Sequence, residues 1–438
     1  MEPSDPYGGA AAMMGLWQTE EEYVENDHFL ILSGGDNWTG PAISTWTKGE
    51  SMIDVMNAMK YTATAIGNHE FDFGIDILYN RLDQADFSFI SANIREKATG
   101  EIPDFAQPYI IREINAVNVG IIGLSSISTY TSTHPANVAD LDFIAYTEAL
   151  NEYVPLMVAD GAELLIVIAH LCSNEIFDLL PTLTDLGVHL IGGGHCPEKI
   201  ATVSEGVAII MTGKNLQSYG VVGMNFDSVS DTMITIDVVL KDNIGGDPEP
   251  IIESIVANWQ SYADDHLNQI IGYTESTIVL RSPAMLNMIV DSWLISYPSA
   301  DFAFTNRGGI RQDIPAGDIQ ISTIIGLMPF DNYIMELELT GTEIMAYLDY
   351  NWPAIGGLTT IGGYQFFDGT PIDSNTTYNV LINDYMYAAN DGNNWSTIDL
   401  NPNQISINYR QPVIDWLESI NTSAVNPLDN YLDPTSRQ

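Results

Sequence analysis

Basic residues are scarce in this sequence. Lysine and arginine together number 14, against 58 aspartates and glutamates, so the formal net charge is −44. A field of this sign repels the phosphate backbone of DNA and RNA, so we expect no nucleic-acid polymer as a partner. An anionic small substrate would need local positive charge, from a metal ion or from the few arginines. Such a surface suits high salt, abundant divalent cations or an extracellular setting.

Cysteines, charged residues as a whole and long apolar runs are also limited. Charged residues make up 16% of the chain, below the ~25% typical of soluble domains. The two cysteines, Cys172 and Cys196, are too few for a disulfide framework, and we expect both to be small packing residues. No run is long enough to span a bilayer, and Met1 is followed by acidic residues rather than a signal peptide. We therefore expect an extracellular, cell-surface or periplasmic protein whose chain carries neither a transmembrane segment nor a signal peptide.

The chain is long enough for two domains. Its 438 residues exceed the usual size of one hydrophobic core, and 45% of them are hydrophobic. In the first half, short apolar runs alternate with helical patterns such as 50–60 and 146–160, which predicts an α/β domain. The polar stretch "KDNIGGDPEP" at 241–250 indicates a linker, and a helix is expected to follow at 251–271.

The second half predicts a separate α+β unit. Helical patterns occur at 284–296 and 341–350, among apolar runs that read as strands. We therefore predict an α/β domain at 1–240, a linker with a connecting helix at 241–270, and an α+β domain at 271–438.

Apolar runs in the first half end at polar side chains. Each run reads as a buried strand, and open α/β layers build their sites where such strands end. Four runs end at a potential metal ligand, namely Asp36, Asn93, His170 and His195. A single histidine at a strand end is more often structural. Four clusters in this order would rarely arise by chance, and they contain Asp36, then Asn68 with His69 and Asp72, then His170, and then His195. Together they predict a site for a hard divalent ion.

The stretch "TATAIGNHEFDFG" at 62–74 places further polar side chains between two glycines. It contains Asn68, His69 and Asp72. An ordinary polar turn is one interpretation of this stretch. The other is a place where metal and phosphate meet, with the glycines allowing the backbone to turn tightly enough to aim adjacent side chains at one centre.

The residue sequences of these clusters and their order along the chain resemble the motifs of a known family. The segments are "GGDNWTGP", "GNHEFD", "IAHLCSNE" and "GGGHCP", followed in the second half by "FTNRGGIRQDI", "MPFDNYIMELELTG" and "INDYMYAANDGNNW". They resemble the calcineurin-like metallophosphoesterases, specifically the two-domain 5'-nucleotidases, over nearly the whole chain. The resemblance implies an N-terminal αββα sandwich and a smaller C-terminal α+β substrate-binding domain. It also implies a divalent metal cofactor (Zn, Mn, Mg or Ca) and a nucleoside phosphate or other small phosphoester as substrate.

The resemblance assigns roles by position. In the first domain it implies Asp36 as the carboxylate that bridges two metals, and Asn68, His170 and His195 as further ligands of the second metal. His69 is implied as the catalytic imidazole, which stabilises the phosphoryl transition state or protonates the leaving group. Asp72 is implied as its orienting partner. The expected chemistry is in-line attack of a metal-activated water on a phosphate monoester. A contact of Cys196 with a metal is an alternative to its packing role.

In the second domain the resemblance implies residues that bind substrate. They are Arg281, Asn306, Arg311, Tyr385 and Asp391. Guanidinium groups suit phosphate or ribose oxygens, Asn306 matches a base contact, Tyr385 a stacking aromatic and Asp391 a ribose-hydroxyl acceptor. Surface salt bridges and turn positions remain the alternative for each, and Arg307 has no assigned role.

Three departures from the family pattern affect the expected activity. The family's opening Asp-x-His-Gly strand, which supplies two ligands to the first metal, is absent here, and the match begins at the Gly-Gly-Ala-Ala helix start. Pro197 stands where a further ligand of the first metal is usual, and Leu358 falls where a second aromatic is expected at the base. The first two departures concern the same metal, so one ion rather than two is expected.

Two functions therefore stay open. The first is a phosphomonoester hydrolase of 5'-nucleotidase type with a degraded first metal site. The second is a catalytically weak or inactive relative used for extracellular binding or assembly, as an oligomer or filament. A missing interior strand exposes backbone donors and acceptors, which can pair with a strand from another chain.

Overall fold

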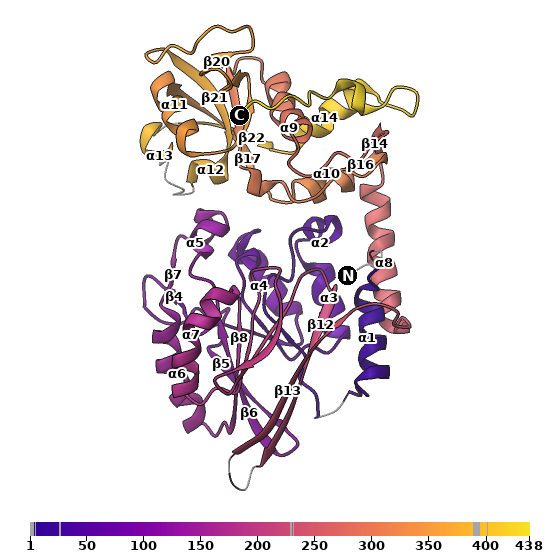
Figure 1. The fold of residues 1–438 in the computed structure, drawn as a ribbon, viewed down its shortest axis with the longest axis vertical. Helices are drawn as coiled ribbons and strands as arrows, with labels where there is room; N and C mark the ends of the chain where they lie inside the picture. Colours follow the sequence, from indigo (N-terminus) through magenta and orange to yellow (C-terminus); the bar gives the residue numbers. More distant parts are fainter. Residues whose placement is uncertain are drawn as a thin grey trace. The chain divides into compact units, whose positions relative to one another are not determined.

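The computed structural model describes residue 4, residues 6–25, 28–227, residue 230, and residues 232–388, 395–400 and 402–438. The chain forms two compact units. Unit 1 comprises Met1–Trp38, Thr47–Thr133 and Asn137–Gln260, and unit 2 comprises Thr39–Trp46, His134–Ala136 and Ser261–Gln438. Figure 1 labels their elements. None of the helices in the described part of the chain combines the length and apolar character needed to cross a bilayer.

Unit 1 is built on two sheets. The smaller one has the order β1-β2-β3 and is parallel throughout. The larger one has the order β10-β11-β9-β8-β6-β5, with a parallel centre and antiparallel strands at both edges. The strands of these sheets are β1 (Leu32–Ser33), β2 (Ala63–Ala65), β3 (Ser88–Ile90), β5 (Tyr109–Ile114), β6 (Val117–Leu124), β8 (Leu164–Ala169), β9 (Leu190–Gly192), β10 (Lys199–Ser204) and β11 (Val207–Thr212).

Helices cover the outer faces of both sheets. The inner faces share one apolar core, in which Ala63 and Ile90 of the small sheet meet Ile121 and Ile166 of the large one. The outer layers are α3 (Glu50–Ala58) and α4 (Ile75–Gln84) on the small sheet, and α6 (Tyr146–Ala159) and α7 (Ser173–Asp185) on the large one. The unit is therefore an αββα sandwich, as predicted.

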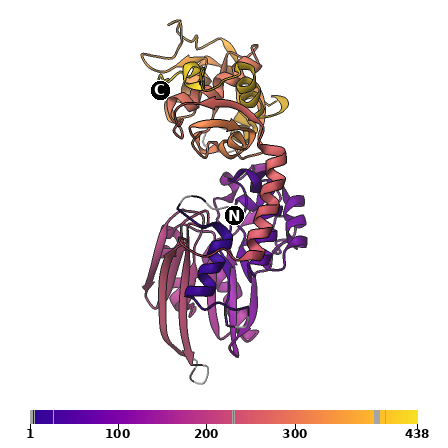
Figure 2. The same cartoon turned by 90° about the vertical axis from the view of Figure 1, so that its right-hand side faces the viewer.

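The remaining elements of unit 1 lie around this sandwich. They are α1 (Gly9–Glu20), η1 (His69–Phe71), β4 (Ile94–Glu96), α5 (Thr129–Ser132), β7 (Leu141–Phe143), and the hairpin of β12 (Ser218–Asp227) and β13 (Thr232–Asp242). The short turn η2 (Pro135–Val138) begins in unit 2 and ends in unit 1. Helix α8 (Pro250–Leu267) begins in unit 1, where its buried Ile252 and Val256 pack with α1. Figures 1 and 2 show these two helices side by side.

Unit 2 is a smaller α+β body. Its main sheet has the order β18-β15-β21-β17-β22, in which only β15 and β21 pair in parallel. The strands of the unit are β14 (Ile270–Thr274), β15 (Phe302–Thr305), β16 (Gly317–Gln320), β17 (Tyr333–Thr340), β18 (Ala354–Gly356), β19 (Leu358–Thr359), β20 (Gln365–Phe366), β21 (Thr377–Asn383) and β22 (Asn403–Asn408). Its helices are α2 (Ala42–Trp46), α9 (Pro283–Ser296), η3 (Arg307–Gly309), α10 (Ile321–Leu327), α11 (Gly341–Tyr350), α12 (Asp384–Ala388), α13 (Trp395–Ile398), α14 (Gln411–Ile420) and η4 (Leu428–Tyr431).

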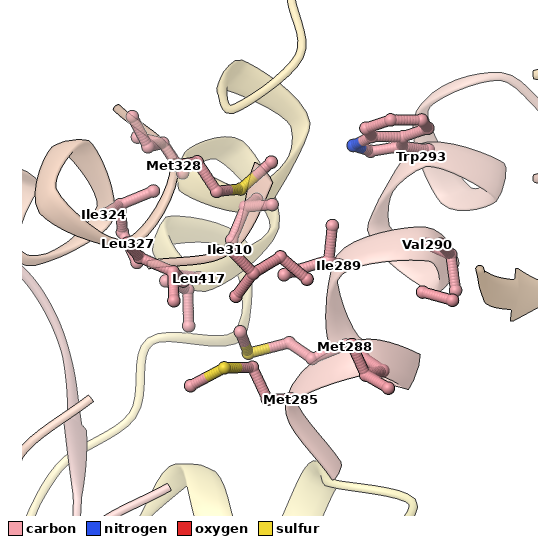
Figure 3. Packing of buried hydrophobic residues seen from close by; sticks show 14 of the residues in the cluster. Met285, Met288, Ile289, Val290, Trp293, Ile310, Ile324, Leu327, Met328 and Leu417 are labelled. Atoms are coloured by element: carbon pink, nitrogen blue, oxygen red, sulfur yellow. The ribbon is translucent and has the colours of Figure 1, made fainter. Parts of the chain in front are cut away.

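Two apolar clusters hold unit 2 together. Helix α9 is buried almost all round, and its Met285, Ile289 and Trp293 pack with Leu417 of α14 and with α10 (Figure 3). The second cluster joins the sheet to α11 and includes the fully buried Trp395. Burying side chains of this size stabilises each cluster by roughly 1.5–3 kcal/mol per residue.

Candidate metal centre

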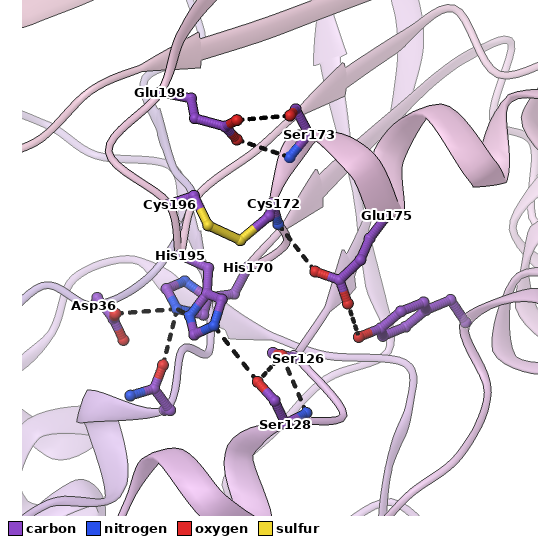
Figure 4. The surroundings of a disulfide bond; sticks show 12 residues. Asp36, Ser126, Ser128, His170, Cys172, Ser173, Glu175, His195, Cys196 and Glu198 are labelled. Atoms are coloured by element: carbon purple, nitrogen blue, oxygen red, sulfur yellow. Dashed lines mark hydrogen bonds and ion pairs between the residues drawn. A yellow bond between two sulfur atoms is a disulfide. The ribbon is translucent and has the colours of Figure 1, made fainter. Parts of the chain in front are cut away.

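The side chains of Asp36, His170 and His195 converge, with ligand atoms within 4.8 Å of one another. Strands β8 and β9 are parallel neighbours, so their carboxyl ends bring His170 and His195 to the same edge of the sheet. His195 Nδ1 lies 3.0 Å from His170 Nε2, and Asp36 Oδ2 lies 3.0 Å from the same nitrogen. Figure 4 shows the three side chains together.

Asn68 completes this group. Its Oδ1 lies 3.1 Å from His170 Nε2, while its amide nitrogen donates to Ser132 O at 3.1 Å. The second contact fixes which end of the amide faces the histidine. The structure thus brings together the four side chains predicted as metal ligands.

The donor set fits a divalent cation. His170 Nδ1 lies 2.8 Å from Gly34 O, a pure acceptor, so this nitrogen carries a proton, and Nε2 presents a lone pair whenever the ring is neutral. That lone pair faces the oxygens of Asp36 and Asn68 and the Nδ1 of His195. Several hydrogen-bond acceptors close to one point repel one another unless a positive charge lies among them. Imidazole nitrogens and carboxylate and amide oxygens are also the atoms that bind Zn²⁺ or Mn²⁺ in proteins.

The pKa shifts also favour positive charge at this point. Burial alone would raise the pKa of Asp36, but His170 and His69 hold it far below its usual range. Burial lowers the pKa of His170, but the adjacent Asp36 more than offsets this and raises it. The pKa of His195 is lowered, by burial and by the neighbouring His170. Asp36 is therefore ionised and His195 neutral near pH 7, the states in which both bind metal.

His69 and Asp72 form a pair beside these four residues. His69 Nδ1 lies 2.6 Å from Asp72 Oδ2, and Asp72 Oδ1 accepts a hydrogen bond from Thr133 Oγ1 at 2.9 Å. The backbone N–H of His69 donates to Asp36 Oδ1 at 2.9 Å, and its Nε2 lies 3.9 Å from Asp36 Oδ2. The short helical turn η1 that begins at His69 therefore places the imidazole next to the Asp36 carboxylate.

Glu70 is a functional residue that the sequence analysis missed. Its carboxylate is only 1% exposed and accepts hydrogen bonds from the backbone N–H groups of Asp36, Asn37 and Gly67, at 2.9, 2.7 and 2.6 Å. Burial and the charge of Asp36 raise its pKa. The carboxylate ties the loop of Asp36 to the loop of Asn68. Its position in "GNHE" was a signal, but sequence alone does not show that it points inward.

Close approach of these loops also explains the first glycine of the 62–74 stretch. A Cβ atom on Gly67 would lie 2.3 Å from Asp36 Oδ1 and 2.7 Å from Asp36 N. Asp36 itself has a φ of 57° and His195 one of 63°, so both ligands adopt the left-handed conformation that costs non-glycine residues energy. Such strain persists only where surrounding contacts hold it.

The prediction for the two cysteines was wrong. Cys172 and Cys196 form a disulfide bond with each other, instead of being separate packing residues or a metal ligand (Figure 4). Each follows a candidate ligand histidine closely, at the ends of two adjacent strands. That placement was the available signal, but it depends on knowing that β8 and β9 are neighbours.

Asn93 is not a ligand. Its amide nitrogen donates to Ser125 O at 2.8 Å, and its oxygen accepts from Ser125 N at 2.7 Å and from Ser91 Oγ at 3.2 Å. The side chain is fully buried and its polar atoms are used to join β3 to the end of β6. Among the described residues, Asp36, His170 and His195 are the only cluster of His, Cys, Asp and Glu side chains with metal-binding geometry.

The predicted substrate residues of unit 2 lie in varied surroundings. Arg281 donates through Nε and Nη2 to Ile310 O at 3.3 and 3.2 Å, and the Arg311 guanidinium lies 5.8 Å from the Phe330 ring centroid. Asn306 Oδ1 accepts from Asn383 Nδ2 at 2.8 Å, and Tyr385 packs partly buried against the apolar cluster around Trp395. Asp391 lies outside the described residues. Leu358 is fully buried.

Arg307 adds a third cation to this region. Its guanidinium lies 5.6 Å from the Trp352 ring, and its pKa is lowered by burial and by Arg281. Within the described part of the chain, neither Arg281, Arg307 nor Arg311 forms an ion pair with a carboxylate, although acidic residues outnumber basic ones about fourfold. Their hydrogen bonds go to uncharged acceptors, as from Arg281 to Ile310 O and from Arg307 to Gln438 Oε1, so their charge is not neutralised by a carboxylate and could attract an anionic ligand.

Comparison with known proteins shows which proteins the chain resembles in sequence and in fold. Residues 266–366 match the family model described as 5'-nucleotidase, C-terminal domain. A 5'-nucleotidase of Vibrio parahaemolyticus is 24% identical over 490 aligned positions, covering 96% of this chain and 87% of the relative. The solved 5'-nucleotidase precursor of Thermus thermophilus has the same fold, with a TM-score of 0.78 at 22% identity, covering 95% of this chain and 92% of that one. The chain is similar in sequence and in fold to the two-domain 5'-nucleotidases.

These similarities confirm the predicted resemblance and the predicted fold class. The relatives named 5'-nucleotidase support a phosphoesterase of that type. Other relatives are larger proteins. The endonuclease YhcR of Bacillus subtilis is 23% identical over 84% of this chain, but the chain spans only 34% of the length of YhcR.

Proposed function

We propose that this 5'-nucleotidase relative hydrolyses a phosphomonoester of a nucleoside, using a divalent cation held by Asp36, Asn68, His170 and His195. The observation that carries the proposal is the convergence of these four side chains, distant in sequence, beside the His69–Asp72 pair. When bound, a divalent cation polarises the phosphate and lowers the pKa of a bound water.

The protein residues would orient the substrate and move a proton. Because Asp72 accepts a hydrogen bond from His69 Nδ1–H, it fixes the tautomer of His69 and raises the basicity of Nε2. A proton held at Nε2 can then be donated to the leaving oxygen or to a non-bridging phosphate oxygen. The Asp36 carboxylate, which lies next to His69, gives the centre a negative charge and so favours the cation.

One ion rather than two is part of this proposal. Pro197 has no side-chain ligand atom, and Asn93 is occupied with Ser125. A single ion neutralises less of the phosphate charge than a pair of ions, so we expect low turnover. The Cys172–Cys196 disulfide is typical of oxidising compartments, which supports an extracellular, cell-surface or periplasmic location.

Nucleoside recognition is proposed for residues 271–438. Arg281 and Arg311 would bind phosphate or ribose oxygens, Asn306 and Tyr385 the base, and Asp391 a ribose hydroxyl. We assign the metal chemistry to residues 1–240 and the connecting helix to 241–270. The net charge of −44 favours a small phosphoester over a nucleic-acid polymer.

The test is phosphate release from adenosine monophosphate with Mn²⁺ or Zn²⁺. We expect His69→Ala to lower kcat by about 10²- to 10⁴-fold, the usual contribution of a general acid–base group. His28→Ala, in an exposed histidine, is the matched control and is expected to keep wild-type kcat. Phosphate release at equal rates by wild type and His69→Ala, with each metal tested, would reject the proposal.

The alternative is a binding or assembly protein. The observation that favours it is strand β1, which pairs with β2 on one side and has no strand on its other side among the described residues. An open edge can accept a strand from another copy. Light scattering after size-exclusion chromatography tests this alternative, which requires oligomers or filaments at micromolar protein and is rejected by a strict monomer.

A further inference from the structure

The Cys172–Cys196 disulfide joins the two loops that present His170 and His195. Cys172 lies two residues after His170, and Cys196 directly follows His195. A second link runs parallel to the covalent one, because the Glu198 carboxylate accepts hydrogen bonds from Ser173 N and Ser173 Oγ at 2.9 and 2.7 Å. Figure 4 shows both links beside the candidate metal centre.

The two loops differ in how firmly the rest of the fold holds them. Cys172 is the N-cap of α7, and its N–H donates to Glu175 Oε2 at 3.1 Å. The other oxygen of Glu175 accepts from Tyr146 OH at 2.9 Å, which ties the helix start to α6. Helix α7 buries its apolar face against the large sheet, so Cys172 is part of a rigid body.

The loop of His195 has less support, which comes from two backbone hydrogen bonds: Gly193 N donates to Ile210 O at 2.9 Å, and Gly213 N donates to Glu198 O at 2.8 Å. The pairing of β8 with β9 ends at Gly192, and the ligand lies beyond it, after Gly193 and Gly194. Glycines leave a loop with the most conformational freedom, and His195 itself has a φ of 63°. Its ring nitrogens contact the side chains of two described residues, with Nδ1 3.0 Å from His170 Nε2 and Nε2 3.5 Å from Ser128 Oγ.

We infer that the Cys172–Cys196 disulfide positions His195 in the metal centre, because it ties the loop of His195 to the rigid helix α7. Metal affinity then depends on the closed disulfide. The inference rests on the proposed function. With the disulfide open, the left-handed His195 can relax to a more stable backbone conformation that turns its ring away from His170. The remaining Glu198–Ser173 link is part-buried and not covalent, so it holds the loop less firmly than the disulfide does.

The test is the affinity of the oxidised full chain for Mn²⁺, measured by calorimetry, in the wild type and in the Cys172→Ser/Cys196→Ser variant. Mn²⁺ is the probe because thiols and hydroxyls are poor ligands for it compared with carboxylates. We expect affinity to fall about 10- to 100-fold, as when a residue that orients a metal ligand is removed. Ser173→Ala, which keeps the disulfide, is the control and should change affinity far less.

A His195→Ala background separates positioning from a general loss of structure. If the disulfide acts through His195, opening it in this background causes no further loss of affinity. An equal additional loss there would overturn the inference. Should the double serine variant not fold, the folded wild type reduced with a phosphine is measured instead, and unchanged affinity would overturn the inference in the same way.

The two proposals fail differently. No Mn²⁺ binding by the oxidised wild type would reject the proposed metal centre and, with it, this inference. Wild-type binding together with an unchanged double serine variant would reject the disulfide's role and leave the proposed function intact.

Discussion

The imidazole of His69 is held from two directions. Its backbone N–H is fixed to Asp36 and its ring nitrogen to Asp72, so the ring can neither slide away from the ligand carboxylate nor rotate. Asp72 is in turn fixed by Thr133. Thr133 therefore orients Asp72, and Asp72 orients His69, as in catalytic pairs whose members are held in place by a further residue.

Replacing Asp72 by Asn tests this arrangement. An amide oxygen is a weaker acceptor than a carboxylate and carries no charge, so Nε2 of His69 becomes less basic. We expect kcat for phosphate release to fall about 10- to 100-fold with little change in KM. Thr133→Val, which removes only the hydrogen bond to Asp72, should have a smaller effect. A kcat equal to that of wild type would show that Asp72 does not act through His69.

Among the secondary structure elements, η4 of unit 2 depends on one carboxylate. Asp429 accepts hydrogen bonds from Glu275 N, Ser276 N and Thr274 Oγ1, at 2.7, 3.1 and 2.9 Å, and so joins η4 to the end of β14. The neighbouring Leu428 is fully buried. Burial alone would raise the pKa of Asp429, but these donors hold it below its usual range.

The lowered pKa of Asp429 predicts in which direction the stability of the protein changes with pH. A carboxyl group whose pKa is lower in the folded state stabilises the fold above its unfolded pKa of about 4, and this contribution is lost as pH falls through the folded pKa. We expect Asp429→Asn to lower the free energy of unfolding by about 1 kcal/mol at pH 7, with the difference shrinking toward zero as pH falls through the lowered pKa of Asp429 in the folded state. Urea unfolding at several pH values measures this, with the exposed Asp318→Asn as control. A pH-independent difference would contradict the role given to the charge.

At the scale of the whole molecule, self-repulsion from the net charge of −44 opposes folding. Several basic residues lie in exposed ion pairs, such as Lys199–Asp242 at 2.7 Å and Lys60–Glu25 at 3.3 Å. Exposed pairs contribute little, so they do not offset this repulsion. Salt should therefore stabilise the protein by screening, in addition to any specific effect of a bound cation.

A calorimetric melting experiment separates these two effects. We expect Tm to rise with NaCl, and Mn²⁺ at about 100 times its Kd to add about 2.7 kcal/mol of stability beyond NaCl of equal ionic strength. A chelator should remove only the Mn²⁺ effect. Asp36→Asn should lose the same effect and keep the response to NaCl. If Mn²⁺ and matched NaCl gave the same Tm, the stabilisation would be screening alone.

Local patterns in the sequence determined much of the architecture. The helix predicted at 341–350 is α11, Gly341–Tyr350, and the one predicted at 251–271 is α8, Pro250–Leu267. Such helices follow from periodicity and capping over a few turns of chain. The family motifs gave the two-domain fold and the four side chains that converge on one point.

Contacts between distant segments were decided only by the tertiary structure. The sequence could not show that Cys172 bonds to Cys196, that Glu70 points inward to the loop of Asp36, or that Asn93 is occupied with Ser125. These outcomes depend on which strands are neighbours and how closely their loops approach. Strand order arises from packing of the whole sandwich, whereas a motif records only residues that are adjacent along the chain.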